Sequence, residues 1–454
     1  MRENPRRYDK LDTDNDNDND NDAKCDSTHQ DRSPMRLYDI IAALITLAAL
    51  FSWFNHRFLK LPTAIGLMLI ALLMSLTLLS PLPGTDGLEQ DVKRMLGSIA
   101  FDETVLHGML GFLLFAGALH VRLTDLARHR AAILVLASLG VLISALLVGV
   151  GAWLLFLLLG LPVPFIYCLL FGTLISPTDP IAVLSILKQA AAPKSLETKI
   201  TGESLFNDGV AVVLFLVLVK IAVGGTAGMH PGIFLGAFFT EALGGLALGL
   251  GTGGLAYLMM RSIDNYQVEV LITLAVASGA YAVAEHWHVS APITVVIAGL
   301  LIGNLAREGV WSAETMRYVD AFWELVDEVL NAVLFVLIGL EVMVMKMSAP
   351  ILLAGLLAIP LVLAARAVST GVPLAALKRF RTWSPGVVAI LTWGGLRGGI
   401  SVAMALALPH GEARDILVSV TYVVVVFSIL VQGLTLAPFI RSMGRRADLE
   451  FSQT

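Results

Sequence analysis

Three carboxylates and two prolines lie within apolar stretches that are long enough to cross a membrane. Ser176-Pro-Thr-Asp-Pro180 interrupts one stretch, and Gly202-Glu-Ser-Leu-Phe-Asn-Asp208 lies in the next. A charged side chain at bilayer depth costs about 2.5–3.5 kcal/mol on insertion scales, and a proline removes a helix hydrogen bond. Membrane-spanning chains keep such features only where protein covers the backbone or where they line a cavity. The sequence therefore predicts a polar binding site at membrane depth.

The residue types near this site suit a monovalent cation and a proton. Glu203 and Asn207 are four residues apart, and Ser204 and Asp208 repeat that spacing, so the polar side chains share one helix face. Oxygen ligands for a dehydrated alkali cation are available from Asp208, Ser204, Asp179 and the carbonyl groups that Pro180 frees near Thr178. A buried carboxylate also accepts a proton, and a bound cation competes with that proton. One group that holds either is the simplest device for exchanging them.

Two arginines within apolar sequence need acidic partners. We expect Arg397, inside the Gly394-Gly-Leu-Arg-Gly-Gly399 interruption, to form a structural ion pair with Glu203. Deleting one partner of a buried pair costs about 3–5 kcal/mol, because the other charge is left uncompensated. Arg366 either pairs with an acid near the site or braces a helix. The acidic run Glu324–Glu328 is either a solvated helix end or an acidic entrance.

The elements that must position these residues are predicted to be membrane-crossing helices. The chain is 56% hydrophobic and 15% charged, whereas soluble proteins carry about 25% charged residues. The pattern predicts an all-α polytopic membrane protein with about thirteen spans. These are 37–54, 61–80, 102–121, 131–159, 163–188, 200–223, 231–260, 266–286, 290–305, 318–345, 349–378, 385–408 and 414–440.

Lysine and arginine residues are concentrated in alternate loops between these spans. Because positively charged loops stay in the cytoplasm, we expect the C-terminus to be cytoplasmic and the N-terminus outside, in a plasma membrane, here a bacterial inner membrane. Residues 1–36 are polar, with Asp and Asn alternating within 12–22, and cannot bury enough apolar surface to fold. Met35 is an alternative start, so this tail could be missing from the native protein.

Internal symmetry is suggested by the two interrupted spans. If 231–260 links two six-span halves, the interruptions at 176–180 and 394–399 fall in the fifth span of each half, and the second half is inverted. Interrupted helices at matching positions of inverted repeats indicate the binding site of a transporter. The two interruptions are therefore expected to cross near the membrane midplane. No phosphate loop, catalytic triad or basic nucleic-acid patch is found, so we expect no enzyme, no cofactor and no nucleic-acid partner.

Over residues 37–441 the chain resembles the cation:proton antiporter superfamily, specifically its NhaP and sodium–proton exchanger branch. The matching motifs are Ile175-Ser-Pro-Thr-Asp-Pro-Ile-Ala-Val183, Gly202-Glu-Ser-Leu-Phe-Asn-Asp-Gly209, Gly394-Gly-Leu-Arg-Gly-Gly-Ile-Ser401, Phe335-Val-Leu-Ile-Gly-Leu-Glu341 and the region of Arg366. The resemblance implies an NhaA/NhaP-like homodimer in which a core domain moves against a dimerisation domain. The expected division is 1–36 polar tail, 37–121 dimerisation helices, 122–223 core, 224–346 linker and dimerisation helices, 347–441 core and 442–454 cytoplasmic tail.

The resemblance also assigns roles to single residues. It implies that Asp208 exchanges the cation for a proton while Thr178, Asp179 and Ser204 help to bind the cation. The Asn207-Asp208 pair resembles that of the electroneutral branch, and the family pairs the positions of Glu203 and Arg397. One departure is Ala116, which stands where many relatives carry a glutamate in the third span, so ion affinity or selectivity could differ.

We therefore expect a secondary active transporter that exchanges a monovalent cation for H⁺, electroneutrally and by alternating access. Na⁺ is the expected cation, with K⁺ or Li⁺ as alternatives. A K⁺-selective proton antiporter is the nearest competing function, and an organic-anion carrier is a further one within transport. A cation channel and a non-transporting membrane sensor are the alternatives from other classes.

Overall fold

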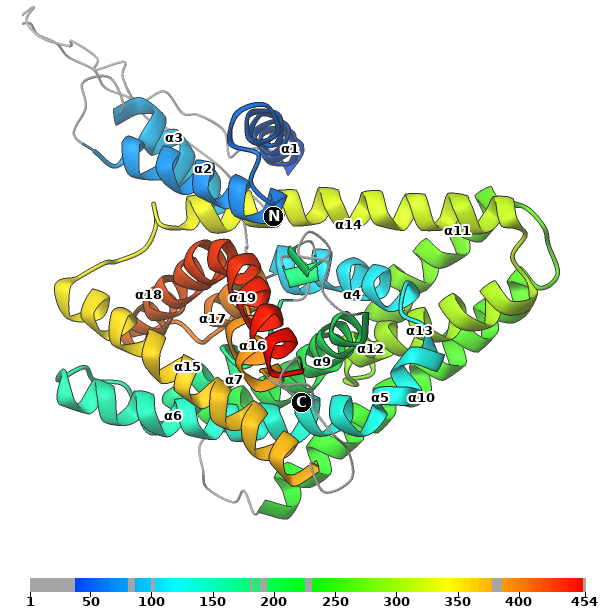
Figure 1. Cartoon of the computed structure of the whole chain (residues 1–454). Coiled ribbons are helices and arrows are strands. Elements are labelled where there is room, and N and C mark those ends of the chain that lie inside the picture. Colours follow the sequence, from blue (N-terminus) through cyan, green and yellow to red (C-terminus); the bar gives the residue numbers. More distant parts are fainter. Residues whose placement is uncertain are drawn as a thin grey trace, which may run out of the picture.

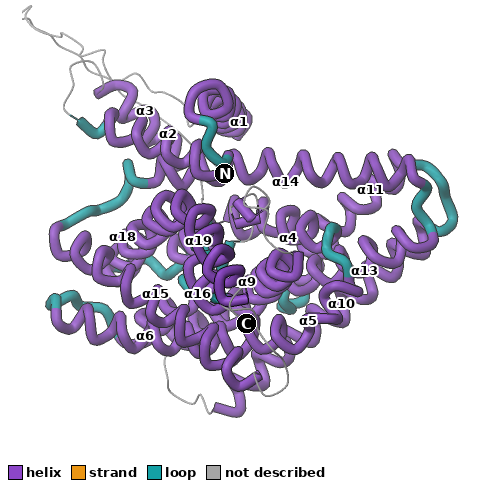
Figure 2. The backbone as a smooth tube through the Cα atoms, in the orientation of Figure 1, coloured by secondary structure: helices purple, strands orange, loops and turns teal. Residues whose placement is uncertain are grey.

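Helices make up all the regular structure in the described part of the chain (Figure 2). The computed structural model describes residues 37–80, 86–98, 103–179, 183–184, 186–187, 194–224, 231–377 and 386–451. The tail at 1–36 and Pro180 lie outside these ranges, and so do the predictions made for them.

The first half of the chain contains eight labelled helices (Figure 1). They are α1 (Leu37–Phe54), α2 (Thr63–Leu78), α3 (Asp86–Ser98), α4 (Leu110–Leu119), α5 (Leu123–Val135), α6 (Val141–Leu158), α7 (Phe165–Leu174) and α9 (Lys194–Gly224). Short π-helical segments extend three of them, at Asn55–Leu59 after α1, Glu103–Met109 before α4 and Leu136–Gly140 between α5 and α6.

The second half continues with ten helices. They are α10 (Pro231–Met260), α11 (Tyr266–Ala275), α12 (Tyr281–His286), α13 (Ala291–Gly309), α14 (Ala313–Glu341), α15 (Ala349–Leu377), α16 (Val387–Trp393), α17 (Gly399–Leu406), α18 (Glu412–Phe427) and α19 (Gly433–Phe451). π-Helical segments join α11 to α12 at Val276–Ala280 and α18 to α19 at Ser428–Gln432.

The prediction of an all-α polytopic membrane protein is confirmed. Eight described helices or helix runs are long and apolar enough to cross a membrane, and three shorter apolar helices accompany them. The number of thirteen spans stays a prediction. Two of the expected spans are interrupted into short helices, α7 and α16–α17, and α14 carries acidic residues in its first half.

One helix, α3, was not among the expected elements. It is thirteen residues long and largely polar, which makes it too short and too polar to span a bilayer. Lys93 and Glu89 form an i,i+4 ion pair at 2.6 Å on its surface, while Met95 and Leu96 are buried. Its apolar side therefore packs on the protein and its polar side stays exposed.

Helix α14 divides the molecule, with α1, α2 and α3 on one side and the larger helix bundle on the other (Figure 1). Helix α2 packs along α14, and α13 packs between α10 and α4. A second group is built by α15, which packs on both α6 and α18, with α7 packed against α6. Helix α9 contacts members of both groups, including α5, α7, α10 and α13.

The two interruptions meet inside the bundle. Helix α7 ends at Leu174, α16 ends at Trp393, and both are followed by non-helical backbone. The amide of Asp179 donates a hydrogen bond of 2.8 Å to the carbonyl oxygen of Leu396, which joins the two segments. The crossing of the two interrupted helices is thus observed. Gly398 is required here, because a Cβ on it would lie 2.5 Å from Asp179 Oδ2.

Candidate functional site

Four polar side chains of α9 that the sequence singles out are all buried. Glu203, Ser204, Asn207 and Asp208 are each at most 3% exposed. Their i,i+4 spacing places them on one helix face, and that face meets the α7 interruption. Burying this many polar groups is tolerated only when they find partners, and their partners identify the site.

Thr178 connects the α7 interruption to α9 through two hydrogen bonds. Its Oγ1 accepts a bond of 2.9 Å from Asn207 Nδ2 and shares a bond of 2.9 Å with Ser204 Oγ. These contacts bring together Thr178 and Ser204, which were predicted as ligands, and Asn207, the neighbour of Asp208. Asn207 Nδ2 donates to Thr178, whereas Asn207 Oδ1 is buried and has no hydrogen-bond partner in the part of the chain that the structure describes.

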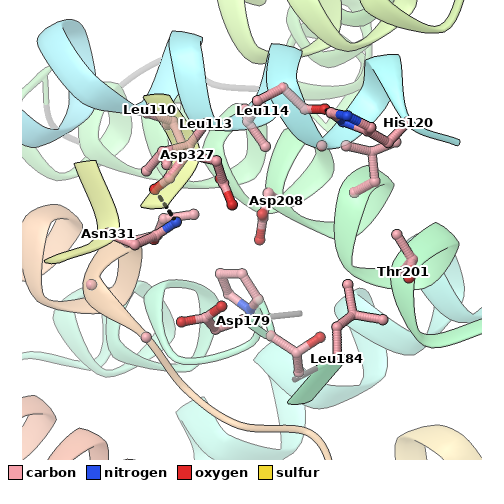
Figure 3. Close-up of a pocket in the computed structure, with 18 of the residues that line it drawn as sticks. Leu110, Leu113, Leu114, His120, Asp179, Leu184, Thr201, Asp208, Asp327 and Asn331 are labelled. Carbon is pink, nitrogen blue, oxygen red and sulfur yellow. Dashed lines mark hydrogen bonds between the residues drawn. The ribbon is translucent and has the colours of Figure 1, made fainter. Parts of the chain in front are cut away.

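Asp208 lies on the wall of a cavity of about 760 Å³ (Figure 3). Thr178 and Asp179 line the same cavity, and the charges of Asp179 and Asp208 interact. Within the described ranges, Asp208 Oδ1 is buried without a hydrogen-bond partner. Because an unpartnered buried carboxylate oxygen is costly, this atom is suited to hold a cation or a proton. Ser204 and Asn207 lie outside the lining and support Thr178 from behind.

The opposite walls come from α4, from α14 and from the second interruption, which was expected at the site. Helix α4 contributes Leu110, Leu113 and Leu114, and the α16–α17 interruption contributes residues 398–401. Helix α14 contributes Asp320, Glu324, Asp327 and Asn331. The spacing of these α14 residues by three or four positions is the signal that would have placed them on one face. Within the described residues, no three acidic, histidine or cysteine side chains converge as metal ligands.

The expected ion pair between Glu203 and Arg397 is wrong. Glu203 pairs instead with Arg366 of α15, whose Nη1 lies 2.5 Å from Glu203 Oε1, and both side chains are buried. Arg366 Nε also donates to the carbonyl of Leu391 at the end of α16, at 3.4 Å. The pair therefore ties α9 to α15 and to the helix before the second interruption.

Arg397 has a different task. Its Nη1 donates to the carbonyl oxygens of Ser176 and Pro177, the latter at 2.9 Å. These carbonyls follow the C-terminal end of α7, where helix carbonyls lack partners and the helix dipole favours a cation. Its own amide is held by Ser428 Oγ at 2.9 Å. The carbonyls near Thr178 that were expected as cation ligands are thus partly occupied by Arg397.

The fold and the site define a class before any comparison with known proteins. Two interrupted helices cross beside a buried carboxylate on a cavity, inside a bundle of membrane-crossing helices. That combination is typical of secondary transporters, which bind substrate where half-helices meet near the membrane midplane.

Comparisons with known proteins agree with that class. The family described as "Sodium/hydrogen exchanger, transmembrane" matches residues 44–442, and the chain belongs to this family. The Na⁺/H⁺ antiporter NhaP of Pseudomonas aeruginosa is 48% identical over 425 residues, covering 92% of this chain and 99% of that protein. The Na⁺/H⁺ antiporter NhaH of Halobacillus dabanensis is 35% identical, covering 86% of this chain and 93% of that protein.

A solved structure shows the same fold. The sodium proton antiporter MjNhaP1 of Methanocaldococcus jannaschii aligns with a TM-score of 0.67 over 90% of this chain and 98% of its own, at 20% identity. At that identity the likeness concerns the fold alone. The expected NhaP-like fold is thereby confirmed.

Proposed function

We propose that this protein exchanges Na⁺ for H⁺ across the membrane by alternating access. Family membership and the antiporter names of relatives such as NhaP and NhaH support this function. The structural observation that carries it is Asp208, which lines a cavity and whose Oδ1 is buried without a hydrogen-bond partner in the described part of the chain.

Asp208 binds either partner but not both. When the carboxylate is deprotonated, it attracts a cation, and we propose that Asp179, Thr178 and Ser204 complete the coordination. Asp179 and Thr178 line the same cavity as Asp208, and Ser204 is hydrogen-bonded to Thr178. When it is protonated, the positive ion loses its main attraction and leaves. The empty carboxylate is charged and strongly disfavoured away from water, so we propose that the site changes sides only when loaded.

One titrating carboxyl group makes the exchange electroneutral. Asn207 occupies the position beside Asp208, and its amide side chain cannot take up or release a proton at the pH values at which proteins work. Its amide is engaged with Thr178. If Asp208 alone alternates between cation and proton, one Na⁺ moves for each H⁺ and no net charge crosses the membrane.

The packing of helices suggests which parts move. We propose that α5–α9 and α15–α19 form the core that carries the site, within residues 122–223 and 347–441. The helices of 37–121 and 224–346 would form the static, dimerising part. Contacts of α6 with α7 and α15, and of α10 with α13 and α13 with α4, support two such groups. We further propose a homodimer in the plasma membrane with its N-terminus outside and its C-terminus in the cytoplasm.

Proton-gradient dissipation in everted membrane vesicles tests the function. We expect Na⁺ to dissipate the gradient, and parallel additions of K⁺ and Li⁺ establish selectivity. Asp208→Asn is expected to abolish the response while the protein still inserts, and Glu328→Gln, an exposed acid outside the cavity, serves as the control. A fully active Asp208→Asn protein would remove the central claim. Cation flux without proton counter-movement would favour a channel.

A further inference from the structure

Helix α14 places a polar stripe on the cavity wall that faces Asp208 (Figure 3). The stripe consists of Asp320, Glu324, Asp327 and Asn331, at intervals of four, three and four residues. That spacing follows one face of a helix. Glu328, the neighbour of Asp327, is exposed and is not part of the lining. The acids of the stripe therefore share the face of α14 that lines the cavity. They are not simply the acidic end of a helix in solvent.

The first acid of the stripe is already paired. Both terminal guanidinium nitrogens of Arg307 donate to Asp320, one of them at 2.8 Å, and His120 Nε2 lies 3.6 Å from the same carboxylate. Asp327 lies two turns further along α14, and its ion pairing is different. Among the described residues, no lysine or arginine forms an ion pair with it. Asp327 instead lines the same cavity as a second acid, Asp179. Like charges facing one cavity favour a bound cation between them.

Asn331 adds an oxygen that has no hydrogen-bond partner among the described residues. Its Nδ2 donates a hydrogen bond of 2.7 Å to the carbonyl oxygen of Asp327, one turn earlier in α14. The amide is therefore oriented, and its Oδ1 is buried without any hydrogen-bond partner, although the residue lines the cavity and is only 6% exposed. Leaving such an oxygen unsatisfied is unfavourable. A ligand that interacts with oxygen atoms would remove this cost.

We propose that Asp327 and Asn331 form a second, outer position for a monovalent cation on the α14 wall, across the cavity from Asp208. Carboxylate and amide oxygens together are the ligands that hard cations prefer. A cation held there lies in the same cavity as Asp208, so it can pass to the exchanging carboxylate within that cavity. The proposal rests on the proposed function, because it names the route by which that function is supplied with its cation.

Transport kinetics give the first test. If the outer position loads the cation, Asp327→Asn raises the apparent KM for Na⁺ about tenfold, which corresponds to about 1.4 kcal/mol of binding. The maximal rate at saturating Na⁺ stays within about twofold of wild type, because Asp208 is untouched. Glu328→Gln is the matched control and leaves both values unchanged. An unaltered KM in Asp327→Asn overturns the proposal, and so does loss of transport at all Na⁺ concentrations in inserted protein.

Cation binding to purified protein gives a second test that does not depend on transport. Anything that binds the folded state raises its melting temperature. In Asp208→Asn the inner site is disabled, so NaCl, compared with choline chloride at equal concentration, still raises Tm if the outer position exists. The rise disappears in Asp208→Asn/Asp327→Asn and persists in Asp208→Asn/Glu328→Gln. No rise in Asp208→Asn overturns the outer position, whereas failure of wild-type protein to exchange cations overturns the proposed function separately.

Discussion

Glu203 of α9 and Arg366 of α15 form a buried ion pair, with 2.5 Å between Oε1 and Nη1. Neither residue contacts the cavity, so the pair holds the helix that carries Asp208 without taking part in exchange. Helix α9 therefore carries two kinds of acid. Glu203 must stay charged to keep the ion pair, whereas Asp208 must alternate between its charged and its protonated form.

Removing one partner of this pair should destabilise the protein. Glu203→Ala leaves the buried Arg366 charge without its partner, and we expect a loss of about 3–5 kcal/mol. The melting temperature of purified Glu203→Ala should fall well below that of Asp208→Asn. A double-mutant cycle distinguishes the partner: Glu203→Ala should couple strongly to Arg366→Met and weakly to Arg397→Met. Equal melting temperatures for Glu203→Ala and wild type would contradict the pairing.

Thr178 should contribute to cation affinity through its hydroxyl. Thr178→Val preserves the shape of the side chain, but it leaves Asn207 Nδ2 without its acceptor and Ser204 Oγ without its neighbour. The loss of about 1–3 kcal/mol per unsatisfied group predicts an apparent KM for Na⁺ that is about tenfold higher or more. Thr178→Ser keeps the hydroxyl and is expected to behave like wild type. Equal loss in both variants would show that the methyl group matters and the hydroxyl does not.

Exchange should be insensitive to membrane potential. Asn207 beside Asp208 cannot titrate, so Asp208 is the carboxyl group that we expect to alternate between cation and proton, and a one-for-one exchange is the expected stoichiometry. Thiocyanate, a permeant anion, collapses the potential of everted vesicles but keeps the pH gradient. The rate of Na⁺-driven proton movement at a fixed pH gradient is therefore expected to stay the same with and without thiocyanate. A marked slowing would show that net charge moves in each cycle.

Much of the fold could be predicted from the sequence because lipid imposes simple rules. Long apolar runs mark helices, since every backbone group must be satisfied within the segment. The interruptions at 176–180 and 394–399 were visible as prolines and glycines, and the hydrogen bond from Asp179 to Leu396 confirms that they meet. Helix α3 was missed because it is amphipathic and lies between spans, where hydropathy carries little information.

The partners within the site could be predicted only in part. Spacing on one helix placed Glu203, Ser204, Asn207 and Asp208 together, because i,i+4 geometry is local. The choice between Arg366 and Arg397 as the partner of Glu203 depends on how α15 and the α16–α17 interruption pack, which spacing does not contain. Arg397 goes to the carbonyls of Ser176 and Pro177, whose need for donors arises only once α7 has ended. Spacing also does not show that Asp327 and Asn331 line the cavity, because that depends on how α14 packs.

Gly398 should be indispensable where the two interruptions cross. A Cβ on this residue would lie 2.5 Å from Asp179 Oδ2 and 2.8 Å from Asp179 Cβ, closer than van der Waals contact allows. Gly398→Ala must therefore push Asp179 away and strain its hydrogen bond to Leu396. We expect transport to fall by at least about tenfold, since small displacements at a binding site have effects of this size, while the protein still inserts.

The matched control for this change is Gly371→Ala in α15. A Cβ there would lie 3.6 Å from Val388 Cγ1, which is ordinary contact, so the substitution tests the added methyl group without the clash. Na⁺-dependent proton movement in everted vesicles, normalised to the amount of inserted protein, compares the two. Wild-type rates in Gly398→Ala would mean that the crossing tolerates a wider separation. The close approach of the two interruptions would then not be what positions Asp179 beside Asp208.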